Sequence, residues 1–344
     1  MIADNNLLLP DELERRQMFH LLKKHSSWTA WNRILGYYQK WADITEESVR
    51  QADNNGLLPK TVHPPGYTTP PGVKEDMGQT SIYYRDYVKV TQGLALFDEG
   101  VKRLVRGDKR VFNADEANDF FGRSLDCTSH YQWAKRKLED GEISWKETTP
   151  LMKEFFESLS ELLDAWYECA HDILEPSPDP RWPDAPNVAK VSYYLTHMIF
   201  LPQLPYPKPL PEIPEIYELM EIETGEDVPF SGIWEPVKGS THIGAMNYLH
   251  GGREAPQLEQ IYRDITELDY GYASTTIDVT WRLIWRDNRY EDGTIPEEER
   301  DYRFIDPCPH DENYPGGDPF KYLERHNLQN PLLAGVRPES ETGK

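Results

Sequence analysis

The sequence predicts a mostly α-helical fold: a helical bundle of about six helices in the N-terminal part and a smaller α+β C-terminal part that contains a short antiparallel sheet. Three observations predict this class. Apolar side chains recur at steps of three and four through the N-terminal part. A proline-rich stretch then interrupts the chain, and beyond it short apolar alternation with more glycine is typical of strands and turns. We therefore expect a helical bundle over 1–201, a linker over 202–216 and an α+β region over 217–344 packed on the bundle.

The first helices follow from capping patterns and apolar spacing. Asp11 and Glu14 form a capping-box pattern, which opens a helix that ends near Ser26. A second helix has one apolar face, made by Trp28, Trp31, Leu35, Tyr38 and Ala42. After the proline-rich breaker at 59–72, a third helix has an apolar seam made by Tyr83, Tyr87, Val90, Leu94, Phe97, Val101 and Leu104.

Three more helices are expected before the linker. Asn113 with Glu116 repeats the capping-box pattern and opens a helix to about residue 138. Thr149 and Pro150 suit the cap and first position of a helix that buries Leu151, Phe155, Leu159, Leu162, Trp166 and Ile173. A last helix over about 187–201 has apolar positions at Val188, Val191, Leu195 and Met198.

The linker has the sequence PQLPYPKPLPEIP over residues 202–214 and is expected to be extended. A stiff spacer between two domains explains this composition, and a docking ligand for an aromatic groove is the alternative.

The C-terminal region contains one clear strand and two expected helices. Ile277, Val279, Trp281, Leu283 and Trp285 alternate with polar residues, so Trp281 and Trp285 are expected on one buried face. Ile284 departs from this alternation. A helix opening near Pro256 is expected from Leu258, Ile261, Tyr262, Ile265 and Leu268. Thr294 with Glu297 indicates one more short helix start.

Charge is the strongest global feature of the sequence. Asp and Glu number 59 against 37 Lys and Arg, so the formal net charge is −22. A field of this sign repels nucleic acid and anionic membranes and attracts cationic partners. Ordinary acidic solubility is the alternative explanation. A basic protein partner is therefore expected, with neither nucleic acid nor membrane.

Cysteine and hydrophobic patterns indicate a cytoplasmic protein. Cys127, Cys169 and Cys308 are far apart, so neither a disulfide framework nor a zinc finger is expected. The first residues do not form a secretory signal, and no apolar run approaches the ~20 residues of a membrane span.

No catalytic or cofactor-binding motif is present, so an enzyme is not expected. No cofactor and no metal are expected either. The loop over 307–318 places Cys308, His310, Asp311 and Asp318 close together, which are metal-ligand types, but a plain Pro/Gly/Asp loop explains the same letters.

Two acidic groups are the candidate partner-binding residues. Residues 212–227 contain seven acidic residues and no basic one, the sharpest charge bias in the chain. A second acidic excess follows the aromatic strand, over 289–301. The candidates are Glu221, Glu223, Glu226 and Asp227 in the first group, and Glu291, Asp292, Glu297, Glu298 and Glu299 in the second. Most charge runs are solvated faces, and that alternative stays open.

Four segments carry a family resemblance, in order along the chain: His20 to Asp43, Val228 to Val237, Gly244 to Pro256 and Thr280 to Glu299. With these segments the chain resembles the mostly helical immunity proteins encoded beside polymorphic and type VI secretion toxins. The resemblance implies an inhibitor that binds a cognate toxin and has no catalytic residues. We expect a structural role for the motif residues Trp28, Trp31, Trp234, Glu235, Pro236, Asn247, Tyr248, Trp281, Arg282 and Trp285.

The leading hypothesis is an immunity protein that neutralises a cytosol-acting toxin by stoichiometric inhibition. Two alternatives remain: an enzyme that reverses toxin damage, and an adaptor or chaperone that loads an effector. Protection at sub-stoichiometric amounts would indicate the enzyme, and binding to a loading domain would indicate the adaptor. The oligomeric state is not predicted.

Overall fold

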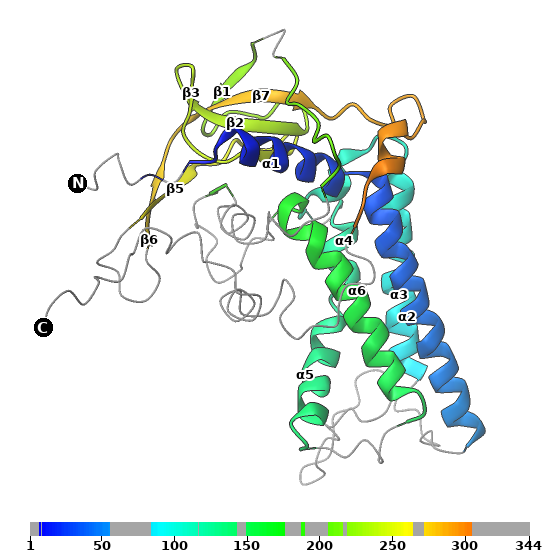
Figure 1. Ribbon diagram of the computed structural model, residues 1–344. Coiled ribbons are helices and arrows are strands. Elements are labelled where there is room, and N and C mark those ends of the chain that lie inside the picture. The colour runs from blue at the N-terminus through cyan, green and yellow to red at the C-terminus, as the bar shows by residue number, and fades with distance from the viewer. Residues whose placement is uncertain are drawn as a thin grey trace, which may run out of the picture. The chain divides into compact units, whose positions relative to one another are not determined.

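The computed structural model describes residue 7 and residues 9–55, 84–115, 117–142, 149–175, 187–189, 206–215, 219–263 and 272–304 (Figure 1). In these ranges all six α-helices precede residue 174, and all seven strands follow residue 220. The sheets are antiparallel. The predicted class, mostly α with a C-terminal antiparallel sheet, is confirmed.

The helices of the described chain are α1 (Glu12–His25), α2 (Trp28–Asn54), α3 (Tyr84–Leu104), α4 (Phe120–Ser124), α5 (Thr128–Glu139) and α6 (Met152–Ile173), with 3-10 turns η2 (Lys109–Phe112) and η5 (Glu297–Asp301). The predicted capping box of α1 is confirmed. The Asp11 carboxylate accepts the Glu14 N–H, and the Glu14 carboxylate accepts the Asp11 N–H, each at 2.8 Å. None of these helices is both long enough and apolar enough to cross a membrane.

Two helix starts differ from the prediction. Asn113 does not open a helix, because it follows η2 and Asp119 caps α4 instead, accepting the N–H groups of Gly122 and Arg123. A turn then separates α4 from α5, so the predicted single helix is two. The helix predicted after Thr149 and Pro150 begins at Met152.

The described chain forms two compact units. The sheet unit consists of the described residues within Met1–Trp31, Arg103–Asn118 and Tyr167–Lys344. The helical unit consists of those within Asn32–Lys102 and Asp119–Trp166. The division expected from the sequence, with a linker at 202–216 and the C-terminal region packed on the bundle, stays a prediction.

An aromatic core holds the helical unit together. The Trp41 ring packs against Tyr131 and Phe155, with centroid distances of 5.9 and 5.5 Å. Tyr38 is also buried, and its hydroxyl donates to the Ser124 carbonyl oxygen at 2.6 Å. Gly93 leaves the space for this bond, because a Cβ there would collide with Tyr38 and lie 2.5 Å from the Ser124 oxygen.

A five-stranded antiparallel sheet organises the sheet unit. Its strands are β1 (Glu221–Glu223), β7 (Thr280–Arg286), β2 (Gly232–Lys238) and β3 (Thr241–His242) in spatial order, and β4 (Asn247–Leu249) also pairs with β2. α1 lies along β2 (Figure 1), where the Arg15 guanidinium pairs with the Glu235 carboxylate at 2.8 Å. A buried cluster that includes Val228, Trp234, Leu258, Val279 and Trp281 forms the core of this part.

A β-bulge explains why Ile284 departs from the alternation of β7. Leu283 pairs with Trp234 and Trp285 pairs with Ile233, so β7 has one extra residue between these pairs. The expectation that Trp281 and Trp285 share one face is therefore wrong. Trp281 is fully buried in the core cluster, whereas the Trp285 ring meets the Phe19 ring of α1 at 6.5 Å.

Two expected helices are strands or bridges in the structure. β5 (Leu258–Arg263) pairs residue by residue with β6 (Tyr272–Ile277), so the helix predicted after Pro256 is wrong. A hairpin partner supplies the backbone hydrogen bonds that a helix would otherwise make internally. Residues 187–189 do not start a helix, because Val188 bridges to Gln257. Residues 190–201 lie outside the described residues.

Candidate functional site

Titratable side chains give no sign of a metal centre in the described ranges. Among those residues, no group of three or more His, Cys, Asp or Glu side chains is arranged to hold a metal ion. The loop with Cys308, His310, Asp311 and Asp318 lies outside the described residues. Neither Cys127 nor Cys169 is part of a disulfide bond.

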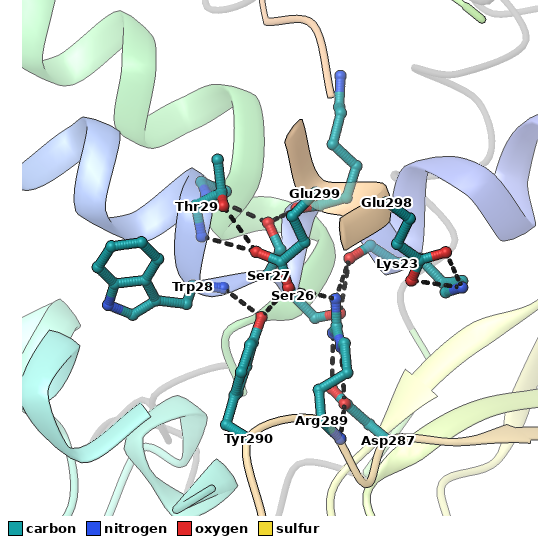
Figure 2. Close-up of polar contacts among 12 residues, drawn as sticks. Lys23, Ser26, Ser27, Trp28, Thr29, Asp287, Arg289, Tyr290, Glu298 and Glu299 are labelled. Atoms are coloured by element: carbon teal, nitrogen blue, oxygen red, sulfur yellow. Dashed lines mark hydrogen bonds and ion pairs between the residues drawn. The ribbon is translucent and has the colours of Figure 1, made fainter. Parts of the chain in front are cut away.

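A buried polar cluster lies instead where α1 ends and α2 begins (Figure 2). Helix ends leave unpaired backbone carbonyl and N–H groups, and buried groups of this kind need partners. At the end of α1, the Arg289 guanidinium donates to the Lys23 carbonyl oxygen at 2.8 Å and to the Ser26 Oγ at 2.6 Å. Its positive charge also suits the negative end of the α1 dipole.

The start of α2 is satisfied by three acceptors. The Tyr290 hydroxyl accepts the Trp28 N–H at 2.7 Å. The Glu299 Oε2 atom accepts two hydrogen bonds from Thr29, one from its backbone N–H at 3.1 Å and one from the Thr29 hydroxyl at 2.7 Å. Ser27 Oγ accepts the Ala30 N–H at 3.1 Å. A carboxylate at this position complements the positive end of the α2 dipole.

Asp287 balances the positive charges of Arg289 and Lys109 in this cluster. It pairs with Arg289 at 2.7 Å and Lys109 at 3.2 Å, and it accepts the Tyr248 hydroxyl at 2.9 Å. Burial raises the pKa of Asp287, but the charges and hydrogen bonds of these partners outweigh it and lower the pKa to about 2. Burial lowers the pKa of Lys109 to about 8, against the opposing attraction of Asp287. The polar groups of this cluster thus form hydrogen bonds and ion pairs with one another and with the two helix ends.

The first acidic group lies on strand β1 and in the residues that follow it, and β1 is the first strand in the order of the five-stranded sheet. All four of its candidates, Glu221, Glu223, Glu226 and Asp227, are exposed. Arg282 pairs with Glu221 at 2.8 Å, and the Thr280 hydroxyl donates to Glu223 at 2.9 Å. The Glu226 carboxylate accepts the Glu223 N–H at 2.8 Å. Carboxylates therefore line this edge, one of them partly neutralised.

The second acidic group is divided by burial. Glu291, Asp292, Glu297 and Glu298 are exposed, but Glu299 is 2% exposed and serves the start of α2. The Lys23 ammonium pairs with Glu298 at 2.9 Å, and Arg286 lies 3.7 Å from Glu291. We do not carry Glu299 into the proposed binding surface, because its carboxylate already has internal partners.

Most of the motif residues are buried within the protein. Trp31, Trp234 and Trp281 are fully buried. Glu235, Pro236, Asn247 and Tyr248 are buried as well, while Trp28, Arg282 and Trp285 are half-buried. These positions hold the fold in the sheet unit and leave few atoms for a partner.

The proline-rich segment is more than a spacer. Residues 206–215, which we call the strap, contain no helix or strand and are bound to α1. The Arg16 guanidinium donates to the carbonyl oxygens of Leu210 and, at 3.2 Å, Pro211. The Tyr206 ring meets the His20 ring at 6.2 Å. Sequence reasoning missed this contact, because the prolines show an extended backbone but not what it lies against.

Comparison with known proteins gives two family matches. Residues 9–65 and 71–179 match the family Immunity protein 71. Residues 213–303 match the family Immunity protein 72. These regions contain every helix and strand whose bounds are given above. The search of curated proteins found no match to the chain, and neither did the search of solved structures.

Proposed function

We propose that this chain, parts of which match two immunity-protein families, neutralises a cognate secreted toxin in the cytosol by binding it directly and stoichiometrically. The toxin would belong to a type VI or polymorphic toxin system, and its contact surface would be basic. The observation that carries this proposal is the pair of family matches. The exposed acidic groups of the sheet unit support the basic character of the partner.

Electrostatic steering explains how the complex would form quickly. A net charge of −22 creates a field that attracts a cationic domain over distances of about one Debye length, ~8 Å at physiological salt. Eight of the nine candidate carboxylates are exposed, so they contribute to this field at the surface. Exposed charges mainly raise the association rate, whereas buried apolar anchors set the residence time.

Binding rather than catalysis also fits the buried cluster in Figure 2. Arg289, Asp287 and Glu299 have the residue types of an active site, but their hydrogen bonds go to helix ends and to each other. A catalytic side chain needs a polar atom within hydrogen-bond distance of the substrate. The polar atoms of these three side chains instead bond to other parts of the protein, which is a structural role.

Titration of the toxin with the purified chain tests the proposal. We expect toxin activity to fall linearly and to vanish at a fixed molar ratio near one chain per toxin. Calorimetry should give the same ratio. Complete protection at a small fraction of that ratio would contradict stoichiometric inhibition and indicate an enzyme. Binding to a loading domain of the effector, without inhibition of the toxic domain, would indicate an adaptor.

A further inference from the structure

The two family matches divide the chain at a different place from its structure. We call residues 9–65 and 71–179 the first family region and residues 213–303 the second. Two inhibitors in tandem would each have a core of their own, joined by a linker that few contacts cross. The sheet unit does not follow this division. It takes α1, η2 and the last residues of α6 from the first region, and strands β1 to β7 from the second.

Helix α1 of the first region packs on the sheet of the second region. It lies along β2 (Figure 1), and the buried Phe19 ring meets the Trp285 ring of β7 at 6.5 Å. The Arg15 guanidinium pairs with the Glu235 carboxylate of β2, whose side chain is only 5% exposed. Both an apolar side chain and a buried charge of the second region are therefore covered by the first.

Buried polar contacts also join the two regions. The Lys109 ammonium of η2 lies 3.2 Å from the Asp287 carboxylate, and these side chains are 8% and 0% exposed. The N–H and hydroxyl of Thr29 donate to the buried Glu299 carboxylate. A buried polar group that loses its partner carries a large desolvation cost. Separation of the two regions would therefore be costly for Lys109 and for the start of α2.

We infer that the two family regions form one composite inhibitor of one toxin, not two inhibitors in tandem that neutralise two toxins. The composite arrangement rests on the contacts within the sheet unit. The number of toxins rests in addition on the proposed function.

The second acidic group shows how one toxin would meet both regions. Glu297 and Glu298 are exposed and belong to the second region. Lys23 of the first region pairs with Glu298 at 2.9 Å. A basic toxin segment that binds these carboxylates would therefore also lie next to α1. The first region thus supports the toxin-binding residues of the second.

Specific cleavage between the two regions tests the inference. A site for a sequence-specific protease is inserted between Asp184 and Ala185 of the full chain, within the interval 180–212 that neither family match covers. After cleavage we expect the two pieces to co-elute at the mass of the intact chain. The cleaved chain should neutralise the toxin at the same end point as the uncut insertion variant, which is the control.

Charge substitutions identify the contacts that hold the pieces together. In the cleaved chain, R15E should make the pieces separate at least about tenfold faster, because two carboxylates would then face each other at a buried site. K40E is the matched control, because Lys40 pairs with Glu161 inside the first region. Circular dichroism before cleavage checks that each variant is folded. If R15E does not fold, E235Q removes the same ion pair with a smaller change, and it should also speed separation.

The outcomes distinguish the inference from the proposed function. A C-terminal piece that separates and stays folded would overturn the composite arrangement, whereas one that unfolds on separation would support it. Equal separation rates in R15E and K40E would also count against it. Two toxin molecules bound per intact chain would overturn the single-toxin part. A wild-type chain that binds no toxin would contradict the proposed function alone, because co-elution of the pieces is measured without toxin.

Discussion

Arg289 and Glu299 lie 3.8 Å apart in the sheet unit, and each serves a different helix end. The guanidinium closes the C-terminal end of α1, while the carboxylate caps the N-terminal end of α2. Backbone groups on both sides of Ser26 and Ser27, where the two helices meet, therefore have hydrogen-bond partners. Both stabilising residues come from the chain after β7, more than 250 residues away in the sequence.

Glu299→Ala should destabilise the protein by about 2–4 kcal/mol. The substitution removes the acceptor of the Thr29 N–H and hydroxyl and leaves the Arg289 charge with less compensation. Urea unfolding of the full chain measures this. Glu298→Ala is the matched control, because its partly exposed pair with Lys23 contributes less than about 1 kcal/mol. Equal effects of the two substitutions would contradict the capping role of Glu299.

His20 should make the protein lose stability in mild acid. Burial and the charges of Lys24 and Lys23 lower the pKa of His20 from 6.5 to about 4, although Glu298 opposes them. Between these values the unfolded chain binds a proton that the folded chain does not, so stability falls as the pH drops from 6.5 to 4. The loss attributable to His20 should be about 1–3 kcal/mol.

His20→Phe keeps a ring between Tyr206 and Tyr302 and should reduce this acid sensitivity. Unfolding free energies at pH 7, 6, 5 and 4.5 measure the slope. Substitution of the exposed His171 by Phe is the comparison, because it makes the same exchange of residue types at another position. An unchanged slope in His20→Phe would show that other groups dominate the acid response.

Lys109 should make stability rise with pH on the alkaline side. Its pKa falls from 10.5 to about 8 on folding, because burial disfavours the charged amine. Between pH 8 and 10.5 the unfolded chain holds more protons, so stability increases with pH. From pH 8 to 9.5, below the range where exposed tyrosines ionise, the gain should be about 1–2 kcal/mol.

Lys109→Met should flatten this rise. The methionine retains apolar contact with the Tyr290 ring, over which the ammonium lies at 4.2 Å. Asp287 keeps its pair with Arg289, and Arg289 then lies between two carboxylates, those of Asp287 and Glu299. Chemical denaturation at pH 7.5, 8.5 and 9.5 compares the two proteins. A wild-type curve that stays flat over this range would contradict the lowered pKa of Lys109.

Charge reversal in the acidic groups should slow toxin association. The variants E226K/D227K and E291K/D292K should each lower the association rate constant several-fold at 50 mM salt, with a smaller difference at 500 mM, because salt screens exposed charges. Stopped-flow or surface-based kinetics measure this. The control E46K/D53K makes the same charge change on exposed residues of α2. If the control slows association as much, net charge rather than these groups steers the partner.

Local patterns in the sequence determined much of the architecture. The capping box of Asp11 and Glu14 predicts the start of α1, and the three-and-four spacing of apolar residues predicts α2, α3 and α6. These features involve residues within a few turns of each other, so they are visible in one sequence. The resemblance to immunity proteins, which rests on the amino-acid sequence alone, is likewise confirmed by the family matches.

Long-range contacts decided the rest. The apolar positions after Pro256 suit a helix or a strand, and the pairing of β5 with β6 makes them a strand. Glu299 looks like its acidic neighbours, yet its contact with Thr29 buries it. The strap is attached through Arg16, about 195 residues away. A local sequence pattern reflects the interactions of a segment with residues near it in the chain. The strand β5, the burial of Glu299 and the attachment of the strap depend instead on partners that only folding brings close.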